Sequence, residues 1–158
     1  MKIISILGST GSIGRSALDV IRLHPDKFNI FALSCYENED LLLQQAIEFR
    51  PLYIVTKDEQ SQSRLLVLLK KNSLKIEVLF GSMGYEFIAS HGDVSTVLAA
   101  ITGAAGLRST FAAAVNGKRI LLANKESMVM AGNLLSKVCS KNNGIIIPVD
   151  SEHNAIFQ

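Results

Sequence analysis

The chain has 158 residues, of which 48% are hydrophobic and 19% are charged, and its formal net charge is +2. This length supplies one ordinary core and is too short for two full domains. The charge balance gives no indication of nucleic acid or an anionic membrane surface as a partner. No segment approaches the ~20 apolar residues of a membrane span, so we expect a cytoplasmic protein. Two distant cysteines, Cys35 and Cys139, favour inert thiols in a reducing compartment.

Short apolar runs alternate with segments of helical periodicity. Strands are predicted over residues 3–7, 28–34, 53–55, 76–80, 94–101, 119–122 and 145–149. Helices are predicted over residues 11–23, 41–49, 61–71, 125–141 and from a glycine-rich turn at 103–106 to about 115, with a short helix or turn at 81–90. One face of the first helix is predicted to carry Ile13, Ala17, Leu18 and Ile21. This alternation predicts an α/β domain with a doubly wound, Rossmann-like parallel sheet and helices on both faces.

A glycine-rich turn, Gly-Ser-Thr-Gly-Ser-Ile-Gly at residues 8–14, follows the first strand and opens the first helix. Glycines allow the tight turn and the close approach of a pyrophosphate, and the helix N-terminus offers free N–H groups. The spacing is one residue longer in its first half than the commonest dinucleotide fingerprint. The turn therefore predicts dinucleotide binding, the alternative being a purely structural tight turn.

The end of the second strand bears on the choice between NAD and NADP. An acid there binds the ribose 2′-OH of NAD, whereas a nearby arginine accepts the 2′-phosphate of NADP. Residues 34–40 read Ser-Cys-Tyr-Glu-Asn-Glu-Asp, with an acid at Glu37 and no lysine or arginine. Taken alone, this segment favours NAD. In the alternative interpretation, its acids only stabilise the N-terminus of the following helix.

Residues 121–127 place Asn124, Lys125 and Glu126 at the start of a long helix. Asn124 suits an N-cap and Glu126 suits the helix dipole, so both residues have structural as well as functional interpretations. Lys125 opposes the dipole at a cost of about 0.3–1 kcal/mol. Binding of an anionic or carbonyl oxygen is a functional reason to keep a lysine there.

The last segment is the most informative. An apolar run at residues 145–147, predicted to be a buried strand, leads into Asp150, Ser151 and Glu152. Ligands bind beyond the carboxyl ends of strands in open α/β sheets, and paired carboxylates suit Mg²⁺ or Mn²⁺. The alternative is capping of a following helix by Asp150 or Ser151. Because the chain ends at Gln158, we interpret this segment as half of an active site at a domain border.

Three segments together, residues 8–14, 122–127 and 148–158, closely resemble the 1-deoxy-D-xylulose 5-phosphate reductoisomerase family, as does the turn at 103–107. The resemblance covers the whole chain and corresponds to the family's N-terminal, cofactor-binding part. It implies rearrangement of 1-deoxy-D-xylulose 5-phosphate and reduction of the product with NADPH, helped by Mg²⁺ or Mn²⁺ as a Lewis acid, in isoprenoid precursor synthesis. Residues 1–158 would form the dinucleotide-binding domain, followed in the full enzyme by a catalytic domain.

The resemblance also implies roles for individual residues. Those at the cofactor pyrophosphate would be Thr10, Gly11, Ser12 and Ile13. Those nearer the nicotinamide would be Asn124 and Glu126. Lys125 and Ser151 would contact the phosphorylated sugar substrate as part of the catalytic site. Asp150 and Glu152 would bind the metal, and Glu152 would also be a catalytic residue. A third acidic ligand and the phosphate-binding residues would lie beyond Gln158.

The sequence departs from the family where the second strand ends. The family usually carries Gly, then Lys or Arg, then Asn, whereas this chain has Tyr36, Glu37 and Asn38. We still expect NADPH, with its 2′-phosphate bound by Asn38, by backbone amides or by Arg15.

Two other classes of function remain open at this stage. Another nicotinamide-dependent dehydrogenase domain, such as that of a semialdehyde or homoserine dehydrogenase, would not need a divalent metal. A non-catalytic nucleotide-sensing module would not turn over substrate at all. The resemblance further implies a homodimer for the full-length enzyme, and we expect the isolated 158-residue chain to be inactive.

Overall fold

The computed structural model describes residues 1–123 and 125–149. The strands are β1 (Lys2–Leu7), β2 (Phe28–Ser34), β3 (Tyr53–Thr56), β4 (Glu77–Phe80), β5 (Thr96–Ala99), β6 (Arg119–Leu122) and β7 (Ile145–Pro148). The helices are α1 (Ser12–Leu23), α2 (Glu39–Phe49), α3 (Glu59–Lys71), α4 (Gly81–Ser90), α5 (Leu107–Val115) and α6 (Lys125–Lys141), with a 3₁₀ turn η1 (Ala104–Gly106) before α5. The predicted order of elements is confirmed, although β5 is shorter than predicted.

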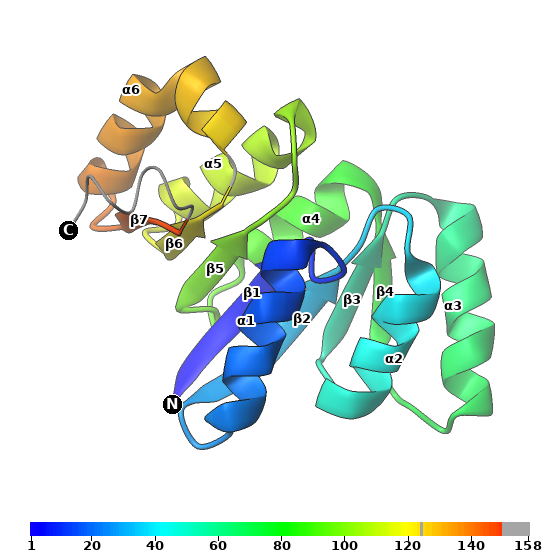
Figure 1. Cartoon of the computed structure of the whole chain (residues 1–158). Coiled ribbons are helices and arrows are strands. Elements are labelled where there is room, and N and C mark those ends of the chain that lie inside the picture. Colours follow the sequence, from blue (N-terminus) through cyan, green and yellow to red (C-terminus); the bar gives the residue numbers. More distant parts are fainter. Residues whose placement is uncertain (124, 150–158) are drawn as a thin grey trace.

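The strands of the described residues form one parallel sheet in the order β4-β3-β2-β1-β5-β6-β7 (Figure 1). The chain builds outward from β1 to β4 and then returns to the other side of β1 as β5. Connections on the two sides of this point leave in opposite directions, which opens a crevice beyond the carboxyl ends of β1 and β5. This topology decides where a ligand can bind.

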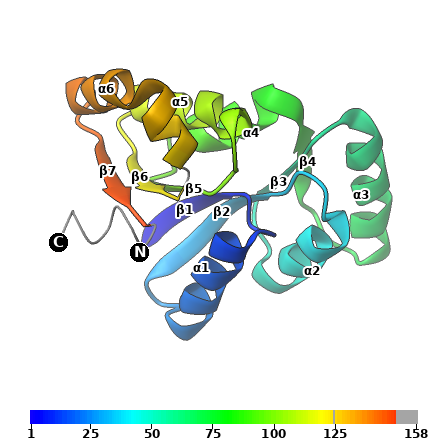
Figure 2. The ribbon, with the colours of Figure 1, turned by 45° about the horizontal axis from the view of Figure 1, so that its top comes forward.

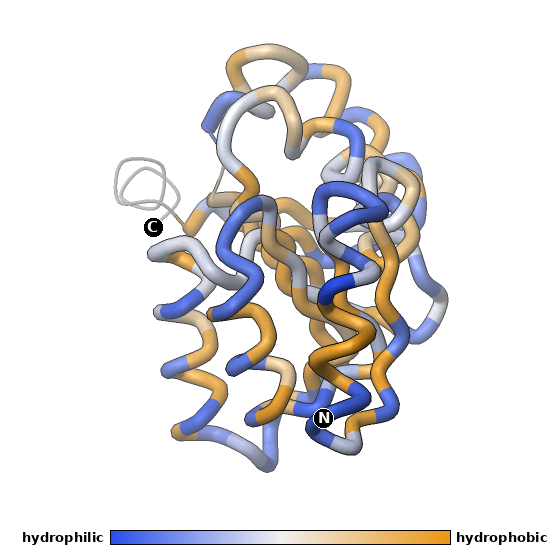
Figure 3. The backbone as a smooth tube through the Cα atoms, turned by 90° about the vertical axis from the view of Figure 1, so that its right-hand side faces the viewer, coloured by the Kyte–Doolittle hydropathy of each residue, from blue (hydrophilic) through white to orange (hydrophobic). Residues whose placement is uncertain are grey.

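Helices cover both faces of the sheet, as predicted. Figure 2 shows α4, α5 and α6 on one face, with α1 and α2 on the other, where α3 also packs. Leu18, Leu42 and Leu65 fill the core under α1–α3, whereas Ile88 and Leu135 belong to the core under α4–α6. The hydrophobic segments run along the central strands in Figure 3. Within the described part of the chain, no helix combines the length and the apolar character that crossing a membrane requires.

Burial differs from the sequence pattern at two places. Ile13, in the first turn of α1, is 39% exposed, whereas Leu18 and Ile21 of the same predicted face are buried. The prediction that the last strand is buried was wrong, since Ile145 is 46% exposed and the rest of β7 is only half-buried. The reason is that, among residues 1–123 and 125–149, β7 is an edge strand, paired with β6 on one side and packed against α6.

Candidate functional site

A cleft of about 630 Å³ opens at the carboxyl end of the sheet. Its walls come from the glycine turn after β1, the segment after β2, the start of α4 and the segment that joins β5 to α5. Predicted cofactor residues that line it are Thr10, Gly11, Tyr36, Glu37 and Asn38. Residues 100–105 contribute an apolar wall in which alanines predominate. The cleft therefore offers both polar groups and an apolar surface.

The glycine turn depends on missing side chains at two positions. Gly8 has φ +85°, and a Cβ built on it would lie 2.7 Å from the carbonyl oxygen of Ala100. A Cβ on Gly14 would lie 2.3 Å from the carbonyl oxygen of Gly8 and 2.6 Å from the Cα of Ser9. Helix α1 and its entry turn are thus packed too closely for any other residue at position 14.

The N-terminus of α1 is left open by its cap. Gly11 is the N-cap residue and provides no side-chain hydrogen bond, and the first turn of α1 contains no acid. Two neighbouring helices differ, because Asn38 Oδ1 caps α2 by accepting from the amide of Leu41 at 3.1 Å and Asp58 caps α3. First-turn amides have no partner within the helix, so those of α1 are available to an anion in the cleft.

A buried hydrogen-bond network fixes the turn to its surroundings. Ser9 Oγ donates to Gln45 Oε1 on α2 at 2.6 Å, and Gln45 Nε2 donates to the carbonyl oxygen of Ser9 at 3.0 Å. The amide of Gly8 donates to Ser34 Oγ at 3.0 Å. Gln45 is not among the predicted site residues, although a glutamine on the apolar face that also carries Leu42 is a detectable signal.

We expect Gln45→Leu to lower the free energy of unfolding by about 1–2 kcal/mol, because it leaves the buried carbonyl of Ser9 without its side-chain donor. It should also weaken dinucleotide binding, since the turn loses its connection to α2. Thermal unfolding and nucleotide titration would measure both effects. Gln44→Leu is the matched control, because Gln44 is the exposed neighbour on the same helix. Equal losses in both variants would contradict this role for Gln45.

The segment after β2 presents its polar residues to the cleft. Tyr36 and Glu37 are exposed there, while Glu39 is 7% exposed and pairs with Arg64 at 2.9 Å. The alternative interpretation, in which an acid stabilises the start of the following helix, therefore fits Glu39 in the first turn of α2. Asn38 is the N-cap of that helix. Glu37 lies before the cap and faces the ligand space.

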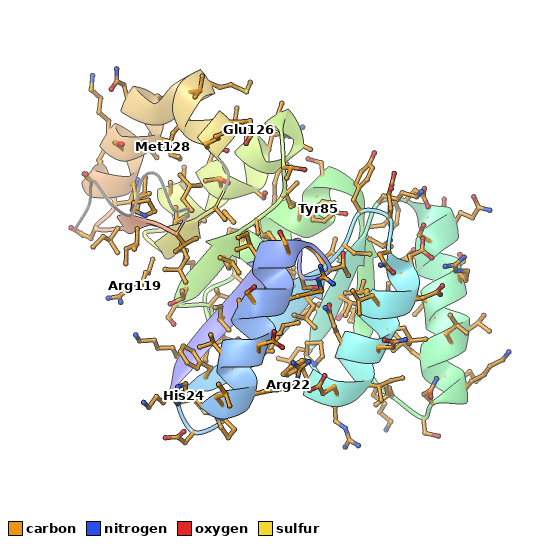
Figure 4. The ribbon with its side chains drawn as sticks, viewed as in Figure 1. Arg22, His24, Tyr85, Arg119, Glu126 and Met128 are labelled. Atoms are coloured by element: carbon orange, nitrogen blue, oxygen red, sulfur yellow. The ribbon has the colours of Figure 1, made fainter. Side chains whose placement is uncertain are left out.

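Tyr85 on α4 fixes the position of this segment. Its hydroxyl donates to the carbonyl oxygen of Cys35 at 2.6 Å, and burial raises the pKa of this phenol well above its usual value. Burial likewise raises the pKa of the Cys35 thiol to about 12, so this thiol is a neutral wall group at physiological pH. Figure 4 shows Tyr85 at the same end of the sheet as Glu126, with His24 at the opposite end.

The remaining predicted site residues among those described do not line the cleft. Ser12 and Arg15 line a separate groove between α1 and α2, so Arg15 is not part of the wall that carries Glu37. Ile13 is also absent from that wall, although its amide belongs to the open first turn of α1. Lys125 is exposed as the first residue of α6, and Glu126 is half-buried beside it.

The metal-site prediction lies outside the described residues. Asn124, Asp150, Ser151 and Glu152 all fall in the parts of the chain that the structure does not describe. The preceding residue Val149 donates its amide to the carbonyl oxygen of Leu122 at 3.0 Å, which keeps it beside β6. Residues 1–123 and 125–149 contain no cluster of three or more acids, histidines or cysteines suited to a metal.

Two cations that line the cleft were missed in the sequence analysis. Lys57 follows β3, and Arg108 is in the first turn of α5. A lysine directly after a strand, at the carboxyl end of a parallel sheet, is a signal that the sequence could have provided.

Comparison with known proteins decides the family. The sequence model of 1-deoxy-D-xylulose 5-phosphate reductoisomerase matches residues 4–132. The chain belongs to this family. A reductoisomerase from Nitrosospira multiformis is 52% identical over 155 residues, covering 98% of this chain and 39% of the relative. One from Lawsonia intracellularis is 53% identical over 155 residues, covering 98% of this chain and 38% of the relative. The chain therefore spans about two fifths of the length of these reductoisomerases.

Solved structures of reductoisomerases share this fold. A crystal structure of a reductoisomerase with NADPH, fosmidomycin and magnesium superposes with a TM-score of 0.97 at 49% identity, covering 100% of this chain and 38% of the other. The reductoisomerase of Zymomonas mobilis with NADPH gives a TM-score of 0.93 at 37% identity, covering 99% of this chain and 41% of the other. The sequence-based resemblance to the family is thereby confirmed.

Proposed function

We propose that this chain is the NADPH-binding domain of an enzyme that converts 1-deoxy-D-xylulose 5-phosphate to 2-C-methyl-D-erythritol 4-phosphate, a step of isoprenoid precursor synthesis. The observation that carries the proposal is the cleft beyond β1 and β5, with its glycine turn and the open N-terminus of α1. Family membership supplies the reaction, and the NADPH-bound relatives support the choice of cofactor.

The cleft fits a dinucleotide in two respects. The first-turn amides of α1, following Thr10 and Gly11, suit the pyrophosphate because they are free donors at the positive end of a helix. The apolar wall at residues 100–105 suits the flat face of the adenine ring. Asn124 and Glu126, at the start of α6, would hold the nicotinamide end of the cofactor.

The substrate and metal roles extend the proposal to residues that the geometry does not test. Lys125 would hold a substrate oxygen, and Ser151 would donate a hydrogen bond to the substrate. Carboxylate oxygens of Asp150 and Glu152 have the donor chemistry that Mg²⁺ and Mn²⁺ favour. When bound, NADPH supplies a hydride and the metal acts as a Lewis acid on chelating substrate oxygens. The remaining wall of the site would come from a catalytic domain, in a cytoplasmic homodimer.

Steady-state kinetics on the protein expressed from its intact gene would test the proposal. We expect NADPH oxidation that requires both 1-deoxy-D-xylulose 5-phosphate and a divalent cation and that stops when the cation is chelated. Turnover of another carbonyl substrate without metal would instead identify a different dehydrogenase. Tight nucleotide binding without any turnover would identify a nucleotide-sensing module.

A further inference from the structure

The cleft brings together charged residues from three elements. Glu37 comes from the segment after β2, Lys57 from the end of β3 and Arg108 from α5. A 2′-phosphate on the adenosine ribose needs a cation where β2 ends, and Glu37 has the opposite charge. The contacts of the positively charged residues in the cleft indicate which of them supplies that cation.

Strand register places Lys57 beside the segment that carries Glu37. Ser34 pairs with Val55 in the parallel β2–β3 ladder, and the amide of Cys35 donates to the carbonyl oxygen of Val55 at 3.0 Å. Tyr36 and Lys57 each come two residues after this last pair of the ladder. Both of these residues line the cleft. The positive charge of Lys57 also tends to lower the pKa of the nearby Cys35 thiol, against the larger effect of burial.

Two other cations near this part of the cleft already have carboxylate partners. Arg108 Nε pairs with Glu86 Oε1 at 3.0 Å, and Arg64 Nε pairs with Glu39 Oε2 at 2.9 Å. Among the described residues, no carboxylate forms an ion pair with the Lys57 ammonium, which is exposed at the mouth of the cleft. An exposed lysine can turn towards a ligand without breaking an existing interaction.

We propose that Lys57 binds the 2′-phosphate of NADPH and is the residue that makes this chain prefer NADPH over NADH in spite of Glu37. This inference rests on the proposed function, because it assigns one part of the same cofactor site. A charge-assisted hydrogen bond from the ammonium to the phosphate offsets the repulsion by the Glu37 carboxylate. The cation is thus supplied across the sheet from β3 rather than from the segment after β2.

Binding titrations on the protein expressed from its intact gene would test this assignment. The ligands are NADPH, NADH, adenosine 2′,5′-bisphosphate and 5′-AMP, the last two of which need no nicotinamide site. We expect Lys57→Gln to weaken NADPH and the bisphosphate by about tenfold, the size of one hydrogen bond to a charged group, and to leave NADH and 5′-AMP within about twofold. The matched control is Lys75→Gln, which removes an equal charge from the turn before β4, at the opposite end of the strands from the cleft.

A charge-restoring variant makes the test specific. Glu37→Lys in the Lys57→Gln background should recover tight NADPH binding, because it returns a cation to the same part of the cleft. Unchanged NADPH preference in Lys57→Gln, equal loss of all four ligands, or a wild type without NADPH preference would each overturn the role of Lys57. Binding of neither NADPH nor NADH by the wild type would overturn the proposed function as well.

Discussion

Gly14→Ala should sharply weaken NADPH binding and lower the free energy of unfolding by about 3 kcal/mol, the upper end of overpacking penalties. The added methyl group would lie 2.3 Å from the carbonyl oxygen of Gly8 and within 2.8 Å of two backbone atoms of Ser9. Backbone atoms cannot move aside as a flexible side chain can, so the turn must separate from α1. In the proposed function the open amides of α1 and the turn form one phosphate site, so we expect a loss in affinity of about 100-fold.

Gly92→Ala is the matched control for this prediction. Gly92 lies in the turn after α4, and a Cβ there would meet no heavy atom within 4 Å. Isothermal titration with NADPH, together with thermal unfolding, separates an effect on the turn from a general effect of losing a glycine. Wild-type affinity in Gly14→Ala would show that the turn relaxes freely and does not form the phosphate site.

The order of strands and helices could be predicted because it depends on local patterns. Apolar runs such as residues 3–7, and helical periodicity such as residues 125–141, need no knowledge of their neighbours. Burial could not be predicted equally well. Ile145 is apolar and yet exposed because β7 lies at the sheet edge, and a strand's place in the sheet depends on the order of all the others.

The candidate site shows the same distinction between local and distant interactions. The glycine turn could be predicted from the sequence because it is local to one strand–helix junction. Gln45 escaped notice because its partner Ser9 is 36 residues away, and Lys57 because it follows β3, whose place next to β2 depends on strand pairing. A side chain that reaches a site from another element can be identified only once the pairing of the strands is known.

Asp150→Asn and Glu152→Gln should each reduce turnover of 1-deoxy-D-xylulose 5-phosphate by at least about 100-fold, since metal activation contributes several kcal/mol to the barrier. Both changes keep the shape of the side chain and remove the charge that a hard cation requires. The affinity for NADPH should stay within about twofold of wild type, because the proposed dinucleotide site consists of the glycine turn and α1 and does not include residues 150 and 152. Kinetics at several Mg²⁺ concentrations would show whether excess cation restores part of the rate.

The comparison with Asp26→Asn makes this metal prediction decisive. Asp26 is an exposed carboxylate in the turn between α1 and β2, at the opposite end of the sheet from the cleft. Its variant should keep full turnover and the wild-type dependence on Mg²⁺. If Asp150→Asn and Glu152→Gln behaved like Asp26→Asn, these two acids would be helix-capping or surface groups. Their loss of turnover with intact NADPH binding would instead assign cofactor and metal to separate elements, with α1 holding the dinucleotide and the segment after β7 holding the cation.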